Sequence, residues 1–276
     1  MRRVALALVV LAAVAATTAC GLDPKPRTLP AGFASPRFLL VSDEAQGPLL
    51  VGGDYGLRYS LDGGRTWRAP TDADEPAVAA APYRTSLLVS RGLTGQVYPY
   101  ALTGTAEPRV PWPFAGAVTL LAGNARLWRL WAVVVDGERR LLYSNDGGQR
   151  WWSMPAVGLC AKPRALAAGA VGPTGAERLW AACGRRGLLV SDDLGASFTP
   201  VPGISNALGV VASRTAVNRL IVLTPNVLAT RDGGRTWTIS GTQAAAVAID
   251  PRNPDLVFAA TTDGRLLASL DGGRSF

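Results

Sequence analysis

The chain has 276 residues and a formal net charge of +8, from 28 basic and 20 acidic residues. The basic residues are arginine except for Lys25 and Lys162; a GC-rich genome produces this bias by default, so we expect no nucleic-acid partner. There is no histidine, which excludes Ser-His-Asp, Cys-His and zinc–histidine chemistry because each needs an imidazole. We expect no metal and no cofactor.

The first 19 residues are predicted to be a signal peptide. Arg2 and Arg3 give a positive start, residues 4–16 are an unbroken apolar run, and small residues lead to Cys20, which resembles the lipobox of bacterial lipoproteins. The run is shorter than the ~20 residues of a membrane-spanning helix. We expect a lipid on Cys20 and a location on the cell membrane, outside the cytoplasm, with residues 20–35 as tether and closing strand. Simple secretion is the alternative.

Two further cysteines, Cys160 and Cys183, remain in the predicted mature chain. Outside the cytoplasm disulfides persist. We therefore expect a Cys160–Cys183 disulfide, with two free buried thiols as the alternative.

A pattern of eight residues recurs five times. It starts with Ser or Thr, has Asp third and Gly fifth, and ends with Trp or Phe. The hydroxyl and the carboxylate can accept hydrogen bonds from turn amides, and glycine can adopt a positive φ. We interpret the aspartates as structural turn residues rather than catalytic acids or calcium ligands. They are Asp62, Asp146, Asp193, Asp232 and Asp271.

The spacing of these aspartates predicts the architecture. Their intervals are 84, 47, 39 and 39 residues, and the first interval holds two periods, with a degenerate copy at 95–104. Six units of about 40 to 45 residues match the period of a four-stranded propeller blade. We predict an all-β fold, a β-propeller of six four-stranded blades forming one domain over residues 36–276.

The last unit predicts strands at 245–250, 256–261 and 265–270, and the sequence given stops after the final motif. Residues 27–32 look like the outer strands of other units. We expect this segment to pair with the last blade and close the ring, which also protects open sheet edges. A seven-bladed ring with a further C-terminal portion is the alternative.

The motif resembles the Asp box of sialidases and related glycosidases, of sortilin-type receptor domains, and of exported photosystem II assembly-factor-like proteins. Sialidases use a Tyr nucleophile with a Glu, a catalytic Asp and an arginine triad. Pro36-Arg37-Phe38 is the nearest approach to their opening segment and does not match it. Tyr55, Tyr59 and Tyr143 are expected to pack. The glutamates, all expected in loops, are Glu44, Glu75, Glu107, Glu138 and Glu177.

The resemblance to the assembly-factor-like group implies a non-enzymatic platform that binds an envelope or membrane protein. We adopt this interpretation, with no enzymatic activity. A carbohydrate-binding or sialidase-like glycoside hydrolase propeller is the alternative.

Two places are candidates for partner contact. Arg185 and Arg186 lie in an expected hairpin loop and could meet an acidic partner, although a solvated turn is the simpler interpretation. Strand alternation would put Arg129 and Trp131 on one face, where they could bind a sugar ring or a partner loop. Ordinary packing between blades is the alternative for Trp131.

Overall fold

The computed structural model describes residues 25–34, 36–42, 48–70, 74–83, 86–91, 96–100, 116–124, 127–171 and 177–276. The expected signal peptide and the lipid-bearing Cys20 lie outside the described residues. So does part of the degenerate motif copy predicted at 95–104, of which residues 96–100 are described and form β7 (Gln96–Tyr100).

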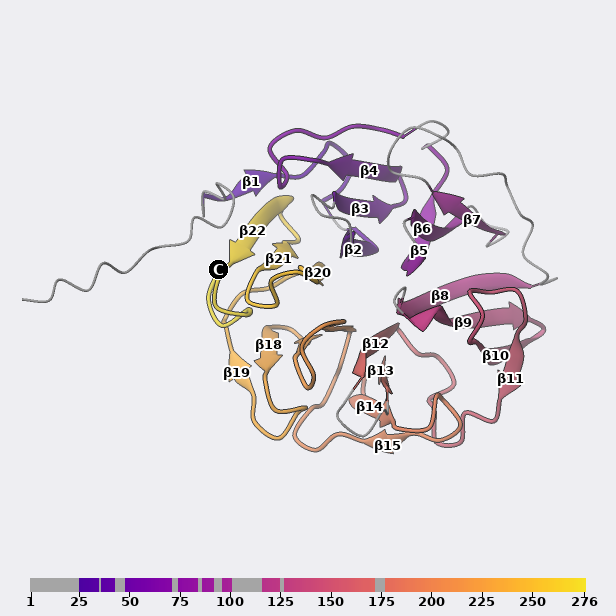
Figure 1. Ribbon diagram of the computed structural model, residues 1–276. Coiled ribbons are helices and arrows are strands. Elements are labelled where there is room, and N and C mark those ends of the chain that lie inside the picture. The colour runs from indigo at the N-terminus through magenta and orange to yellow at the C-terminus, as the bar shows by residue number, and fades with distance from the viewer. Residues whose placement is uncertain are drawn as a thin grey trace, which may run out of the picture.

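The described strands form six antiparallel sheets arranged around a common centre (Figure 1). The first two sheets have three strands each: β2 (Phe38–Val41), β3 (Leu49–Gly53) and β4 (Gly56–Ser60); β5 (Ala77–Tyr83), β6 (Ser86–Arg91) and β7. The next two have four strands each: β8 (Ala117–Asn124), β9 (Arg129–Asp136), β10 (Glu138–Ser144) and β11 (Trp152–Met154); β12 (Ala165–Val171), β13 (Glu177–Ala182), β14 (Leu188–Ser191) and β15 (Thr199–Pro200).

The last two sheets also have four strands. They are β16 (Gly209–Ala212), β17 (Leu220–Leu223), β18 (Val227–Thr230) and β19 (Thr238–Ile239); and β20 (Ala246–Ile249), β21 (Val257–Ala260) and β22 (Arg265–Ser269) with β1 (Arg27–Thr28). The predicted strands of the last unit therefore match β20, β21 and β22 to within one residue at each end. Short apolar runs bounded by Asn, Asp, Gly and Pro give these strands their ends.

Among the described strands, β1 alone pairs far from its place in the chain. It lies antiparallel to β22, with Arg27 opposite Leu266 and Thr28 opposite Arg265. The amide of Leu29 continues the contact by donating to the carbonyl of Gly264 at 2.8 Å. Leu29 and Phe33 are buried among side chains of β2, β3, β20 and β21.

Hydrophobic clusters fill the interfaces between neighbouring sheets. Six clusters of buried residues occur in the described part of the chain, each drawn from two adjacent sheets. One of them joins the last sheet to the first, through Phe258 and Ala248 on one side and Leu39 and Val51 on the other. Sheets packed face to face around a centre make this an all-β β-propeller.

Strand order assigns the loops to two faces of the ring. In each sheet the first strand is the innermost, and successive strands alternate in direction. The loop before the first strand and the loop between the second and third strands therefore lie on the same face of the ring. We call this face the mouth. The motif turns, between third and fourth strands, lie on the opposite face, which we call the motif-turn face.

Candidate functional site

A channel runs through the centre of the ring and is the candidate site. It has a volume of about 430 Å³ and is lined by the inner strands β2, β5, β8, β12, β16 and β20. Its wall carries apolar side chains from each of these strands, including Phe38, Val78, Leu120, Val211 and Val247. Alanine and glycine fill much of the remainder, and their small size keeps the channel open.

The charged groups of the channel are arginines at its ends. Arg37 and Arg164 directly precede β2 and β12, so they lie at the mouth, whereas Arg214 follows β16 and lies at the other end. Arg37 pairs with Asp54 at 2.7 Å. Arg214 donates to the carbonyl of Val41, on a sheet that is not its neighbour, at 2.9 Å.

The described residues that line the channel include no Asp, Glu or Tyr. A glycosidase needs a carboxylic acid to protonate the leaving group, together with a nucleophile or base, which is a second carboxylate in most families and a tyrosine paired with a glutamate in sialidases. The described part of this channel holds no such pair.

The motif aspartates lie away from the channel, and each accepts hydrogen bonds within its own turn. At Asp62, the carboxylate accepts from the Ser60 hydroxyl at 2.7 Å and from the amide of Thr66 at 2.9 Å. The Ser60 hydroxyl in turn accepts from the amide of Gly64 at 2.7 Å. The same three bonds recur in the other four turns, at Asp146, Asp193, Asp232 and Asp271.

These bonds stabilise the ionised carboxylates. The hydroxyl and the amide of Thr236 hold the pKa of Asp232 well below its usual range, and the amide of Arg150 lowers the pKa of Asp146. At Asp62, Asp193 and Asp271 partial burial opposes the shift, but the hydrogen bonds outweigh it and the pKa is lowered. A carboxylate with a lowered pKa is a poor proton donor or acceptor near neutral pH.

The second motif glycine also joins neighbouring sheets. Gly64 has φ +93°, which favours glycine, and a Cβ added there would lie 2.3 Å from Leu266 of β22. The turn therefore closes against the preceding sheet as well as on itself.

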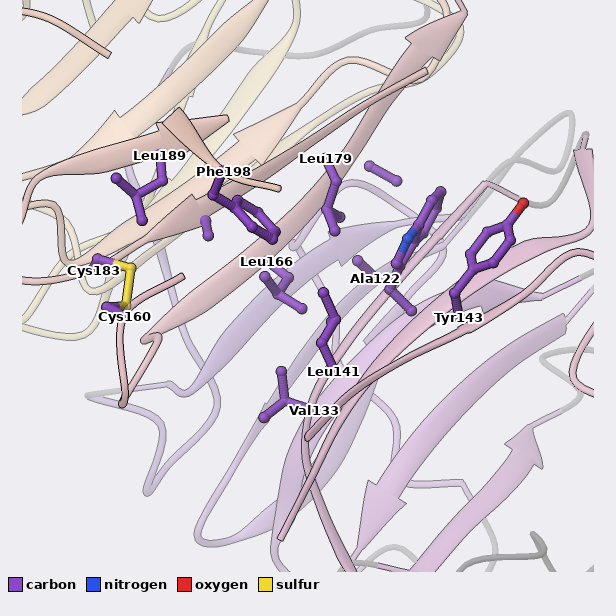
Figure 2. Packing of buried hydrophobic residues seen from close by; sticks show 13 residues of the cluster. Ala122, Val133, Leu141, Tyr143, Cys160, Leu166, Leu179, Cys183, Leu189 and Phe198 are labelled. Carbon is purple, nitrogen blue, oxygen red and sulfur yellow. A yellow bond between two sulfur atoms is a disulfide. The ribbon is translucent and has the colours of Figure 1, made fainter. Parts of the chain in front are cut away.

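The predicted disulfide is confirmed. Cys160 and Cys183 are bonded, with their Cα atoms 5.9 Å apart. The bond joins the loop before β12 to the loop between β13 and β14, so it lies at the mouth. Both cysteines belong to a buried cluster with Leu189 and Phe198, which Figure 2 shows from close by.

Arg185 and Arg186 lie in the second of these disulfide-linked loops, and both are exposed. Arg186 donates to the carbonyl of Gly158 in the first loop at 3.3 Å. The first loop adds two further exposed cations, Lys162 and Arg164. We call these four residues the basic rim.

The proposed partner contact at Trp131 is wrong, because the side chain is 0% exposed. Trp131 packs 5.2 Å from the ring of Tyr143 and donates its indole N–H to the carbonyl of Leu194 in the next sheet at 2.9 Å. Packing between blades, the alternative interpretation, describes its environment.

Arg129 is part of a polar contact between two sheets rather than a free surface group. It pairs with Glu177 at 3.0 Å, and Glu177 also accepts from the side-chain amide of Asn124 at 2.9 Å. Glu177, expected in a loop, is instead the first residue of β13 and is 1% exposed. Burial raises the pKa of the Glu177 carboxyl, and the bonds from Asn124 and Arg129 oppose this.

Sequence reasoning missed Lys162 and Arg164 as members of the rim, and Asn124 and Glu177 as a buried pair. A signal for the rim was present. Each cysteine of the predicted disulfide is followed within four residues by two cations, so the bond alone brings four of them together. No comparable pattern marks Glu177.

Two further properties hold for the described ranges. They contain no helix that is long and apolar enough to cross a membrane. They also contain no group of three or more His, Cys, Asp or Glu side chains that could hold a metal ion.

No protein-family model and no curated protein matches the sequence. Solved structures do resemble the fold. YCF48 bound to a D1 peptide matches with a TM-score of 0.54 and 17% identity over 93% of this chain and 85% of that chain. The GH74 xyloglucanase from Xanthomonas campestris matches with a TM-score of 0.54 and 16% identity over 90% of this chain.

The GH74 enzyme of Niastella koreensis matches with a TM-score of 0.56 and 16% identity over 85% of this chain. This chain spans 54% of the Xanthomonas enzyme and 36% of the Niastella enzyme. A peptide-binding protein and two enzymes therefore have comparable scores. At these identities the likeness shows the fold alone, and the chain has the fold of a β-propeller.

Proposed function

We propose that the protein is a membrane-tethered, extracytoplasmic propeller that binds another envelope or membrane protein and has no enzymatic activity. The observation that carries the proposal is the channel, which is apolar, has arginines at its ends and lacks carboxylates and tyrosines among its described lining residues. Such a channel offers contact area and orientation but no acid–base pair.

The proposal includes six blades and closure by the N-terminal segment. Six sheets and six inter-sheet clusters among the described residues support the blade number. The pairing of β1 with β22 supports closure. We further propose that the motif turns are Asp boxes with a structural role.

The tether is the lipid on Cys20. Cys20→Ser in intact cells is expected to move the protein from the membrane fraction to the soluble fraction, and to abolish incorporation of a radiolabelled fatty acid. Continued incorporation of the label by the Cys20→Ser variant would remove the anchor from the proposal.

Crosslinking from the mouth tests the platform role. Leu208 lies in the channel lining and is 39% exposed, whereas Leu270 lies on the motif-turn face and is 55% exposed. With a photo-crosslinking amino acid at one or the other position of the lipidated protein, a single partner is expected from 208 and none from 270. The same products from both positions would contradict binding at the mouth.

A hydrolysis assay tests the enzymatic alternative. Purified protein is expected to release no fluorophore from sialosides, xyloglucan oligosaccharides or other glycosides above a blank. Turnover that survives repurification would replace the platform with a glycosidase.

A further inference from the structure

The basic rim brings together cations that have no carboxylate partner in the described part of the chain. Among the described residues, Lys162, Arg164 and Arg185 make no side-chain ion pair, and neither disulfide-linked loop contains an Asp or Glu. Elsewhere surface arginines are commonly paired, as in Arg58–Asp74, Arg178–Asp192 and Arg219–Asp255. The arginines of the motif turns follow an Asp by three or four residues.

The rim is held in a defined arrangement. The Cys160–Cys183 bond joins its two loops, and Arg164 passes so close to the other loop that a Cβ on Gly184 would lie 3.2 Å from its Nε. Arg186 and, from the neighbouring sheet, Arg139 each donate to a carbonyl of the first loop, those of Gly158 and Ala161. Loops fixed in this way present their charges with little further loss of conformational entropy on binding.

The rim is continuous with the apolar channel. Arg164 belongs both to the rim and to the channel lining, where Ala165 and Leu208 are also found. A ligand at this place meets positive charge outside and an apolar wall inside. The apolar wall is recessed within the ring of inner strands, so a flat lipid surface would reach the cations but leave the channel empty.

We propose that the rim and the mouth together bind an acidic, extended peptide segment of the partner protein, with carboxylates on the rim and at least one apolar side chain in the channel. Because several unpaired cations are spread over two loops, a ligand with several carboxylates fits them better than a ligand with a single carboxylate. Arginine forks bind carboxylates in a bidentate manner. This inference rests on the proposed function and names the chemistry of the partner.

A peptide-binding assay tests it with the purified mature protein. The probe is a fluorescein-labelled peptide of alternating Glu with Leu and Ala, compared with two versions in which Gln replaces Glu or Ser replaces Leu. Fluorescence anisotropy at low salt is expected to show binding of the first peptide, at least about tenfold weaker binding of the Gln version, and weakening by salt as screening increases. The Ser version is expected to bind about fivefold more weakly.

A matched pair of variants locates the site. Lys162→Gln/Arg164→Gln/Arg185→Gln removes three rim cations. Arg150→Gln/Arg235→Gln/Arg274→Gln removes three exposed cations from the motif-turn face, so the two variants lower the net charge equally. The rim variant is expected to weaken binding by about tenfold, because each exposed charge contact contributes up to about 1 kcal/mol. The control is expected to change binding by less than about twofold. Matching circular dichroism spectra show that both variants fold.

Other outcomes would overturn the inference. Equal weakening by both variants would mean unspecific attraction, and equal binding of the Leu and Ser peptides would exclude the channel. Binding of vesicles containing phosphatidylglycerol, or of inorganic phosphate, without binding of the peptide would assign the rim to an anionic lipid or phosphate instead. If crosslinking from position 208 still captures the partner with the rim variant, the platform role stands and the acidic-peptide inference fails.

Discussion

At the scale of single residues, the motif aspartates act as hydrogen-bond acceptors for their own turns. Asp193 accepts from the hydroxyls of Ser191 and Ser197 and from the Ser197 amide, whereas its neighbour Asp192 points to Arg178 on the surface. We expect Asp193→Asn to lower the free energy of unfolding by about 1 kcal/mol, since charge-assisted bonds to the turn are lost.

The control is Asp192→Asn, which removes an exposed ion pair and is expected to cost less than about 0.5 kcal/mol. Urea unfolding followed by tryptophan fluorescence measures both. Equal losses would indicate that Asp193 has no special role in its turn.

The lowered pKa values of these aspartates predict acid sensitivity. A carboxyl whose pKa is lower in the folded than in the unfolded state, where it is about 3.9, stabilises the fold above that value, and the contribution is lost as the pH falls toward the folded pKa. We expect the free energy of unfolding to drop from about pH 5 downward. Asp232→Asn removes one such group, so its unfolding free energy, measured with urea, should fall less steeply between pH 5 and pH 2 than that of the unchanged protein.

For Glu177 we expect the opposite pH dependence of stability when its partner Arg129 is removed. Burial raises its pKa, and a carboxyl with a raised folded pKa contributes stability at low pH that is lost as the pH rises through that pKa. Arg129→Met should therefore destabilise the protein more at pH 8 than at pH 5, by about 2 to 4 kcal/mol at the higher pH.

Arg265→Met is the comparison, because its partner Asp263 is exposed and the pair contributes less than about 1 kcal/mol. Chemical denaturation at the two pH values gives the difference. A loss at Arg129 that does not depend on pH would mean that Glu177 is neutral in both proteins.

At the scale of elements, the disulfide joins two loops that carry the basic rim. It closes a loop of sequence separation 23, for which loop entropy gives a stabilisation of about 3 kcal/mol. We expect Cys160→Ala/Cys183→Ala to lower the free energy of unfolding by this amount, and reductant to destabilise the unchanged protein but not the variant. A variant as stable as the oxidised protein would contradict the estimate.

Strands with clear boundaries could be predicted from sequence, and those at irregular turns could not. The last unit has Asn, Asp and Gly at its turns, and its three strands were predicted closely. In contrast, the alternation that puts Arg129 and Trp131 on one face holds within β9, which begins at Arg129, but it does not extend to Trp128, which lies in a turn with φ 58°. Whether the strand face that carries Trp131 is buried depends on the neighbouring sheet, and the alternation of residues along one strand does not contain that information.

At the scale of the whole molecule, β1 pairs with β22 and is the fourth strand of the last sheet. We call this pairing the seam. A chain that starts at residue 36 lacks β1, Leu29 and Phe33, so its β22 edge is open. We expect it to unfold at a lower temperature and to self-associate through the free edge. Adding a synthetic peptide of residues 25–34 should restore the transition temperature, which differential scanning calorimetry records.

A scrambled version of that peptide is the control and should restore nothing. If the shortened chain is monomeric and as stable as the full chain, the segment does not close the ring.

The architecture could be predicted because the motif repeats, since five similar turns fix a period without any knowledge of tertiary contacts. The candidate site could be predicted only in part. Its channel takes side chains from six strands spread along the chain, from Phe38 to Val247, and apolar residues on inner strands look like any other core residues in sequence. The basic rim could be predicted only by way of the disulfide, because that bond brings Lys162 and Arg164 next to Arg185.

The β1–β22 pairing also has a consequence for the order of synthesis. β1 is the first of the described strands in chain order, yet it pairs with β22, which follows all the others of that set. The sheets between them can form as the chain emerges, but the β1–β22 seam must wait until β22 leaves the ribosome, so this pairing comes late. A long sequence separation between paired strands slows folding. During that delay β1 and the exposed edge of β22 are the places where a chaperone, or a second copy of the chain, would find a strand to pair with.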